Sequence, residues 1–180
     1  PLMECARFLR ERGFHPVFSI APGLSPDLRS WMVHVLEGED VWEEDGRSLL
    51  SSSIAAAGAS GTASVEAMML GRFMAVLYRG SCLSWLAWKT LVNTRFISIP
   101  NILAGEEVYP EFIQERATGL NVFHALEGFL RGGAYACHVR GSLARAKEAM
   151  GTTGAFRFWA ERISEYLSEG EVSRKRMVRS

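Results

Sequence analysis

Apolar residues recur along this 180-residue chain in two alternating patterns, short continuous runs and longer stretches with helical spacing. Short runs are typical of buried strands and helical spacing of amphipathic helices, so their alternation predicts βα units and a mostly parallel sheet. A first helix is expected from Leu2 to Gly13. Strands are expected at 16–20, 41–42, 54–58, 73–77 and 95–99. Helices are expected at 27–36, 47–52, 62–70, 82–92, 110–115, 121–131, 134–150 and 156–167, and a loop at 101–105.

This order of elements predicts an α/β fold, a Rossmann-like three-layer domain over residues 1–150, followed by a trailing helix and a basic tail over 151–180. The chain enters its first helix at Pro1 without an initiator methionine. We therefore expect that a first strand and its phosphate-binding loop precede it in the parent protein. The acidic stretch 37–45 lacks the residue order of a calcium-binding loop, which favours a solvated loop.

Composition excludes several classes of protein. With 48% apolar residues and three cysteines, the chain is neither disordered nor a disulfide scaffold. Its 20 basic and 20 acidic residues give no net charge and hence no reason to expect a nucleic-acid partner. No apolar run is long enough for a membrane span, and neither a membrane span nor a signal peptide is expected. The cysteines are expected to be reduced and at least half-buried, and the four histidines lack metal-ligand spacing, so no metal site is expected.

A glycine-rich turn joins the strand expected at 54–58 to the helix expected at 62–70. Its glycines permit a sharp turn and close approach of a ligand, and the hydroxyls of Ser60 and Thr62 are hydrogen-bond donors. The free N–H groups and positive dipole of a helix N-terminus favour an anion. The turn therefore predicts a phosphate site, although the same residues are also typical of a purely structural helix cap.

Glu66 lies four residues after Thr62, on the same helix face, whereas a capping box places its glutamate three residues after the cap. The neighbouring helix residues are apolar, so we expect the carboxylate to need a partner. A ribose diol is a suitable one beside a phosphate loop. The alternative is an acidic residue that stabilises the helix start through the dipole alone.

Arg79 follows the strand expected at 73–77, and Asn101 follows the strand expected at 95–99. The carboxyl ends of parallel strands share one edge, where open α/β sheets bind ligands. Arg79 is expected to pair with phosphate and Asn101 to bond a sugar or phosphate oxygen. Taken alone, Arg79 could equally be a surface cation, and Asn101 a residue that forms a turn. A ligand site is favoured because the glycine-rich turn lies on the same rim.

Five segments, in this order and spacing, resemble lipid-A-disaccharide synthase: residues 60–67, 78–79, 85–92, 98–105 and 110–114. The resemblance extends from about residue 16 to the last helix and corresponds to the carboxyl-terminal half of that enzyme. It implies one half of a GT-B glycosyltransferase, in which two Rossmann-like domains face a cleft. It also implies that residues 1–150 bind a nucleotide sugar.

The resemblance implies an inverting transfer of 2,3-diacylglucosamine from UDP-2,3-diacylglucosamine to lipid X, which gives lipid A disaccharide 1-phosphate and UDP. By the same resemblance, the UDP-donor site comprises Ser60, Gly61, Thr62, Glu66, Arg79, Asn101, Glu111 and Gln114. The resemblance implies that Ser60, Gly61 and Thr62 lie beside the diphosphate and Glu66 beside the ribose. Glu111 and Gln114 would lie at the border of the site. The catalytic base is expected in an amino-terminal domain that this chain lacks, so the chain is expected to bind nucleotide without turnover. No cofactor and no metal ion is implied.

Two other functions stay open on the residues alone. One is another UDP-sugar enzyme of GT-B type, such as an undecaprenyl-linked N-acetylglucosaminyl transferase or a relative of the UDP-sugar epimerases. The other is a non-catalytic nucleotide-binding module. The resemblance implies a cytoplasmic protein that contacts the inner membrane peripherally, takes lipid substrates, and binds no nucleic acid, and it leaves an oligomer open. The basic residues at 174–179 are typical of a solvated chain end and also suit anionic lipid.

Overall fold

A computed structural model of the chain describes residues 1–80, 95–151, 158–160, 162–164 and 166. The chain divides into two compact units, Pro1–Ala149 and Met150–Ser180. In the second unit the described residues between 158 and 166 are helical, as the pattern predicts for 156–167. The helix expected at 82–92 lies outside the described residues.

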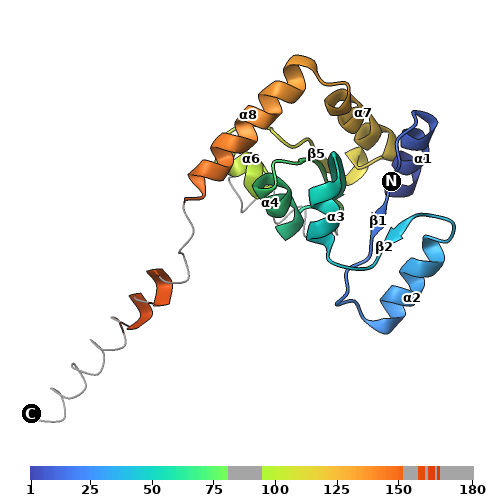
Figure 1. Ribbon diagram of the computed structural model, residues 1–180, viewed down its shortest axis with the longest axis horizontal. Helices are drawn as coiled ribbons and strands as arrows, with labels where there is room; N and C mark the ends of the chain where they lie inside the picture. The colour runs from blue at the N-terminus through green and yellow to red at the C-terminus, as the bar shows by residue number, and fades with distance from the viewer. Residues whose placement is uncertain (81–94, 152–157, 161, 165, 167–180) are drawn as a thin grey trace, which may run out of the picture. The chain divides into compact units, whose positions relative to one another are not determined.

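The first unit has the α/β architecture that the sequence predicts, with its helices packed around parallel strands (Figure 1). The helices are α1 (Leu2–Glu11), α2 (Pro26–Val35), α3 (Gly46–Ser52), α4 (Thr62–Met69), α6 (Ile99–Ala104), α7 (Gly119–Leu130) and α8 (Gly133–Ala149). The strands are β1 (Phe18–Ser19), β2 (Val41–Trp42), β3 (Ala55–Ala59), β4 (Phe73–Tyr78) and β5 (Glu111–Ile113), and a 3-10 turn, η1 (Gln114–Arg116), follows β5.

The strands form two parallel sheets, β1-β2 and β3-β4-β5. In β4, four consecutive residues from Phe73 to Val76 are buried, although neighbouring side chains point to opposite faces of a sheet. Both faces of this sheet are therefore covered, as expected for a continuous apolar run, and α4 and α7 each pack on β3 and β4. Phe73 anchors the core, because its ring stacks on that of Phe129 with centroids 4.4 Å apart.

Local signals fix several of the helix ends. Ser25 and Thr118 accept main-chain N–H bonds at the starts of α2 and α7, and the carboxylate of Asp45 accepts two at the start of α3. Hydrogen bonds from Ser48 and from the main chain hold the pKa of Asp45 below its usual value. After α4, Gly71 has a φ of +65°, which is strained for any other residue except asparagine or aspartate.

The region 95–115 differs from the sequence prediction in three ways. Residues 95–98 form no strand, and the expected loop at 101–105 is the helix α6. Pro100 does not end a strand but occupies the first turn of that helix, where its missing N–H costs nothing, and Gly105 ends the helix with a φ of +69°. The helix expected at 110–115 is instead strand β5, which pairs with β4 from Glu111 to Ile113.

Two further expectations concern the membrane and the thiols. Among the described residues, no helix is both long and apolar enough to cross a bilayer. Cys5 and Cys137 are free thiols, as expected, but only Cys5 is buried, while Cys137 is exposed on α8 and so contradicts the expected burial. Burial raises the pKa of the Cys5 thiol to about 11. Cys82 lies outside the described residues.

Candidate functional site

The carboxyl edge of the three-stranded sheet brings together residues from three separate parts of the chain. In the observed register Ala59 pairs with Leu77, and Tyr78 pairs with Ile113. Each strand is therefore followed, at this one edge, by a polar residue that the sequence singled out: Ser60 after β3, Arg79 after β4 and Gln114 after β5. This edge is where open parallel sheets hold their ligands.

The turn between β3 and α4 leaves the start of α4 without a side-chain cap. Gly61 is the N-cap residue, and no side chain accepts a hydrogen bond from the first turn. The hydroxyl of Ser64, a residue that sequence reasoning missed, donates instead to the Gly61 carbonyl oxygen at 2.7 Å and is buried. The alternative in which Ser60 or Thr62 serves as a structural cap is therefore not realised. The first N–H groups of a helix have no acceptor within the helix and carry the positive end of its dipole.

Glu66 lies one helical turn beyond Thr62 on the exposed face of α4. Its apolar neighbours Ala67 and Met68 are buried, as is Ser64, but the Glu66 side chain itself is exposed and so is not forced by burial to find a partner within the protein. Within the described part of the chain, no side-chain hydrogen bond or ion pair engages Ser60, Thr62 or Glu66. These three side chains are thus available to a bound molecule.

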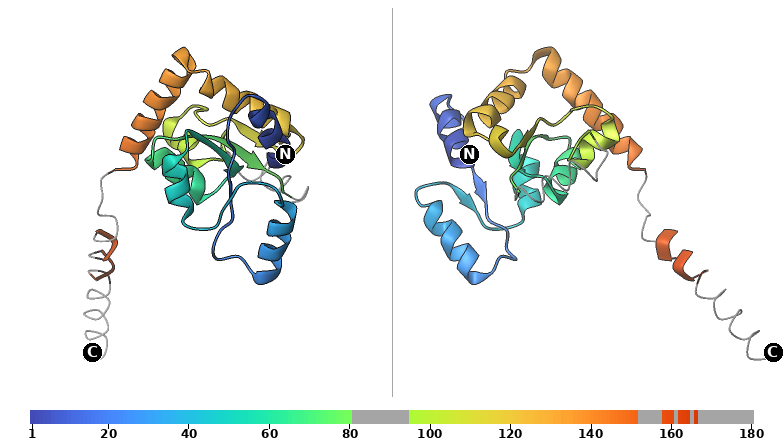
Figure 2. Two further views of the ribbon diagram at one scale, coloured as in Figure 1. Left: turned by 45° about the vertical axis from the view of Figure 1, so that its right-hand side comes forward. Right: turned by 180° about the vertical axis from the view of Figure 1, so that it is seen from behind.

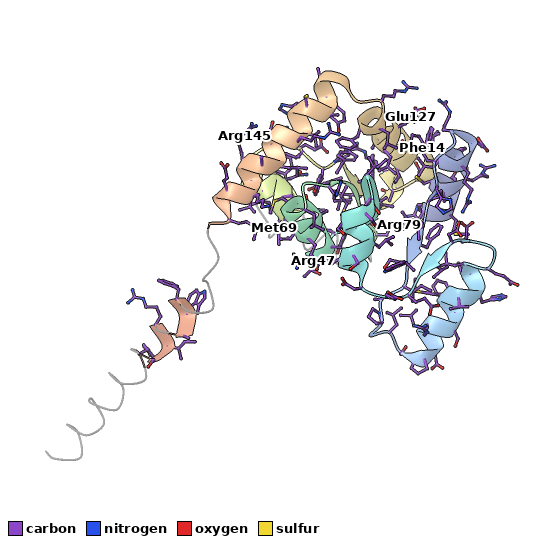
Figure 3. All side chains as sticks on the ribbon, viewed as in Figure 1. Phe14, Arg47, Met69, Arg79, Glu127 and Arg145 are labelled. Atoms are coloured by element: carbon purple, nitrogen blue, oxygen red, sulfur yellow. The ribbon has the colours of Figure 1, made fainter. Side chains whose placement is uncertain are left out.

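Arg79 lies at the carboxyl end of β4, as its position after an apolar run predicts. Its guanidinium donates to the main-chain oxygen of Ala117 at 2.8 Å, and the side chain is exposed. In Figure 3 Arg79 lies apart from Met69, the last residue of α4. One hydrogen bond to a carbonyl leaves most of the five guanidinium N–H donors available, together with the full positive charge.

Gln114 has a main-chain φ of +52°, the one positive φ of a non-glycine residue in the part of the chain that the structure describes. Its side chain bridges to β4: the amide nitrogen donates to the Gly80 oxygen at 3.1 Å, and the amide oxygen accepts from the Gly80 nitrogen at 3.2 Å. Strained main chain at a sheet edge is typical of functional sites, where the surrounding structure holds it. Gln114 thus fixes the direction in which the chain leaves Arg79.

Asn101 and Glu111 lie together, but in the interior rather than at the sheet edge. Asn101 belongs to α6, so the prediction that it follows a strand is wrong. Its side chain is fully buried, and its amide nitrogen donates to Glu111 Oε1 at 2.8 Å. The Glu111 carboxylate also accepts from the main-chain nitrogens of Ile97 and Ser98 and from the Ser98 hydroxyl, at 2.7–2.9 Å. The hydrogen bonds of these two residues therefore hold the segment 97–111 in its folded conformation.

The arrangement suits an anionic ligand that carries hydroxyl groups. Exposed N–H donors at a helix start and a guanidinium can hold phosphate, and a carboxylate one helical turn away can accept from hydroxyls. Across the described ranges, no three His, Cys, Asp or Glu side chains group closely enough to hold a metal ion. Arg79 and the dipole of α4 are positive groups that this edge offers to an anion.

Comparison with known proteins gives a consistent result. Residues 33–147 match the family model of lipid-A-disaccharide synthetase. The chain is 39% identical over 142 residues to a lipid-A-disaccharide synthase of Solibacter usitatus, which covers 78% of this chain and 35% of that protein. It is 39% identical to that of Acinetobacter baylyi over 61% of this chain and 26% of the relative, and 37% identical to that of Azotobacter vinelandii over 64% and 32%. The chain thus spans about a third of the length of the relatives it matches most fully.

Proposed function

The chain belongs to the lipid-A-disaccharide synthetase family, and from that membership we propose that it supplies the UDP-donor half-site of a glycosyltransferase of lipid A biosynthesis. The parent enzyme would transfer 2,3-diacylglucosamine from UDP-2,3-diacylglucosamine to lipid X, with inversion at the sugar carbon, and release UDP. The proposal rests on one observation above all. Three polar side chains that have no partner among the described residues, Ser60, Thr62 and Glu66, lie in or one turn beyond the uncapped start of α4, on the same sheet edge as Arg79.

In this proposal the chain stabilises the leaving diphosphate. As the bond between the sugar and the diphosphate breaks, negative charge accumulates on the phosphate oxygens. The N–H groups at Thr62 and the guanidinium of Arg79 are placed to offset that charge, and the Glu66 carboxylate accepts from the ribose hydroxyls. The base that deprotonates the acceptor hydroxyl acts on the opposite face of the sugar and comes from outside this chain.

In this proposal the remaining site residues support the donor site without contacting the ligand. The hydrogen bonds of Asn101 are used within the protein. The Glu111 carboxylate accepts four bonds, one from Asn101 and three from Ile97 and Ser98, so the two residues hold the segment 97–111 in place for the donor site. Gln114 keeps Gly80 in position and thereby orients Arg79. The parent protein would work at the inner membrane from the cytoplasmic side, because both of its substrates carry acyl chains.

Thermal unfolding of the chain with and without millimolar UDP tests the proposal. A ligand at 100 times its dissociation constant adds about 2.7 kcal/mol of stability, a readily measured shift in Tm. We expect UDP to stabilise the chain, ADP to do so less, and Glu66→Ala to reduce the UDP effect. Glu148→Ala is the matched control, because Glu148 is also an exposed glutamate on a helix but lies away from the donor site. Its neighbour Lys147 donates to the Met69 carbonyl, at the end of α4 opposite Thr62.

Two results would overturn the proposal. The first is a cooperatively folded chain whose Tm does not respond to UDP. The second is a UDP effect that Glu66→Ala and Glu148→Ala reduce equally, because the binding site would then lie elsewhere. Arg79→Ala gives an independent readout, since it should weaken the binding of UDP more than the binding of uridine, which has no diphosphate.

A further inference from the structure

Helices α1 and α7 pack side by side and run in the same direction (Figure 1 and Figure 2). Near their starts, Glu4 accepts from the Gly119 nitrogen at 3.0 Å, and at their ends Arg12 Nη1 lies 2.7 Å from Glu127 Oε1. Both helices therefore end at the same place. Between the two ends lies a cavity of about 200 Å³, lined by Arg12, Phe14, Glu127, Leu130 and Arg131.

The turn after α1 builds the apolar wall of this cavity. Gly13 has a φ of +78°, which reverses the chain, and the Phe14 nitrogen donates to the Leu9 oxygen at 3.0 Å. Such a turn folds the residue after the glycine back onto the end of its own helix. Phe14 thus joins Leu130 of α7, and both are half-buried. In Figure 3 Phe14 and Glu127 lie together, apart from Arg79.

The charged part of the cavity has one more cation than it has anions. The Glu127 side chain is only 11% exposed, and its Oε1 lies 2.7 Å from Arg12 Nη1 and 3.2 Å from Arg131 Nη2. Two guanidinium groups therefore share one carboxylate. Each guanidinium has five N–H donors, whereas the carboxylate has two oxygens, so most of the donors stay available. Both arginines are exposed to solvent at the mouth of the cavity.

Helix dipoles alone would also favour a cation after the last turn of each helix. Here the main chain already caps both ends, because the nitrogens of Gly13 and Gly132 donate to the oxygens of Arg10 and Phe129, at 2.9 and 3.0 Å. The dipoles also give no reason for both arginines to converge on one nearly buried carboxylate beside an apolar wall. Convergent polar groups in an apolar cavity are typical of ligand sites, and guanidinium groups recognise carboxylate and phosphate.

We propose that this cavity binds a small organic anion. Arg12 and Arg131 hold its carboxylate or phosphate group, and an apolar group such as a single ring packs on Phe14 and Leu130. Glu127 positions the two guanidinium groups. The cavity has the volume of about seven water molecules, at about 30 Å³ each, so it suits one ring with its acid group.

This site is separate from the proposed donor site and does not depend on it. The oxygen of Ala117, just before α7, accepts from Arg79, whereas the cavity lies at the other end of that helix. The 12 residues of α7 span about 18 Å. UDP should therefore not compete for the cavity, and failure of UDP binding would leave this proposal intact.

Titration of the chain with phenyl phosphate and with benzoate, followed by NMR of the main-chain amides, tests the proposal. We expect the amide signals of Phe14, Leu130 and Arg131 to shift and to saturate. Inorganic phosphate lacks the ring and benzyl alcohol lacks the charge. Each should therefore bind at least about 10-fold more weakly than phenyl phosphate. Saturating UDP should leave these shifts unchanged.

Three variants separate this site from a general attraction to basic surface. Arg131→Gln should raise the Kd of phenyl phosphate about 10-fold, because it removes one of the two cations. Arg140→Gln is the matched control, since Arg140 is an exposed arginine that lies over the Phe129 ring and does not line the cavity. Glu127→Gln should lower the Kd, because glutamine keeps an acceptor oxygen for the guanidinium groups but removes the competing negative charge.

Four results would overturn the proposal. The first is equal weakening by Arg131→Gln and Arg140→Gln. The second is inorganic phosphate that binds as tightly as phenyl phosphate, because the apolar wall would then play no part. The third is weaker binding in Glu127→Gln, with the signals of buried Ala6 and Val122 unchanged to show that α1 and α7 still pack. The fourth is displacement of phenyl phosphate by UDP, or shifts confined to Ser60 and Thr62, because the anion would then occupy the donor site.

Discussion

Replacement of Asn101 by alanine should remove a large part of the folding free energy of this chain. The Asn101 side chain is fully buried and uses all of its hydrogen-bonding capacity. Its amide nitrogen donates to the Tyr109 oxygen at 2.7 Å and to Glu111 Oε1 at 2.8 Å, and its amide oxygen accepts from the nitrogens of Val108 and Tyr109 at 2.9 and 2.8 Å. One residue thus satisfies three main-chain groups in the interior.

The expected size of the effect follows from those groups. Alanine leaves the N–H and C=O groups of Tyr109 buried without partners, and each such group costs about 1–3 kcal/mol. The Val108 nitrogen loses one acceptor but keeps its bond to the Glu106 oxygen at 3.0 Å. Glu111 loses one donor but keeps three others, so its share is smaller. We therefore expect Asn101→Ala to lower the free energy of unfolding by about 4 kcal/mol, a large fraction of the 5–15 kcal/mol typical of a domain.

Asn101→Asp gives the same reasoning a pH dependence. An aspartate oxygen can accept the two N–H bonds, but the other oxygen then faces the Tyr109 carbonyl and the Glu111 carboxylate, so one carboxyl must hold a proton. Its pKa in the folded variant is therefore raised above the unfolded value. The stability of the variant is highest below the unfolded carboxyl pKa and falls as the pH rises through the folded pKa.

Urea denaturation followed by tryptophan fluorescence measures both effects. Asn121→Ala is the control, because that half-buried side chain donates a single bond, to the Arg116 oxygen at 2.8 Å, and should lose about 1 kcal/mol or less. The reasoning is refuted if Asn101→Ala costs no more than the control. It is equally refuted if the loss in Asn101→Asp does not grow with pH.

Three further predictions concern single groups. Gln114→Gly should be more stable than Gln114→Ala by about 1 kcal/mol in urea denaturation, because both lose the side-chain bridge but glycine alone accepts the positive φ; equal midpoints would argue against strain. With the third cysteine replaced by serine, a disulfide reagent at pH 8 should label exposed Cys137 in the folded chain and Cys5 only after unfolding, because burial raises the pKa of Cys5 to about 11; equal labelling rates would contradict this. The pKa of Glu106 is lowered chiefly by a hydrogen bond from the Ser142 hydroxyl, and the stability that this bond contributes is lost as the pH falls. Ser142→Ala should therefore raise the pKa of Glu106 in a carboxyl NMR titration, and an unchanged pKa would contradict the assignment.

The sequence by itself determined those elements whose signals are local. The run at β4, the glycine-rich turn before α4 and the capped starts of α2 and α7 were all predictable, because a few neighbouring residues decide whether a segment alternates, turns or starts a helix. Ser60 and Arg79 were placed at one edge for the same reason, since each directly follows a recognisable strand. The family resemblance depended on short motifs and was likewise visible in the sequence, and the comparisons confirm it.

Only the tertiary structure decided the region 95–115. Pro100 is compatible with the end of a strand and with the first turn of a helix, and the three residues of β5 are too few to show a period. The choice depends on hydrogen bonds between residues seven to fourteen positions apart, in which Asn101 and Glu111 satisfy the main chain of 97–98 and 108–109. The positive φ of Gln114 has the same origin, because its bridge to Gly80 spans 34 residues. Local propensity contains no term for such bonds, since they exist only once the chain has folded back on itself.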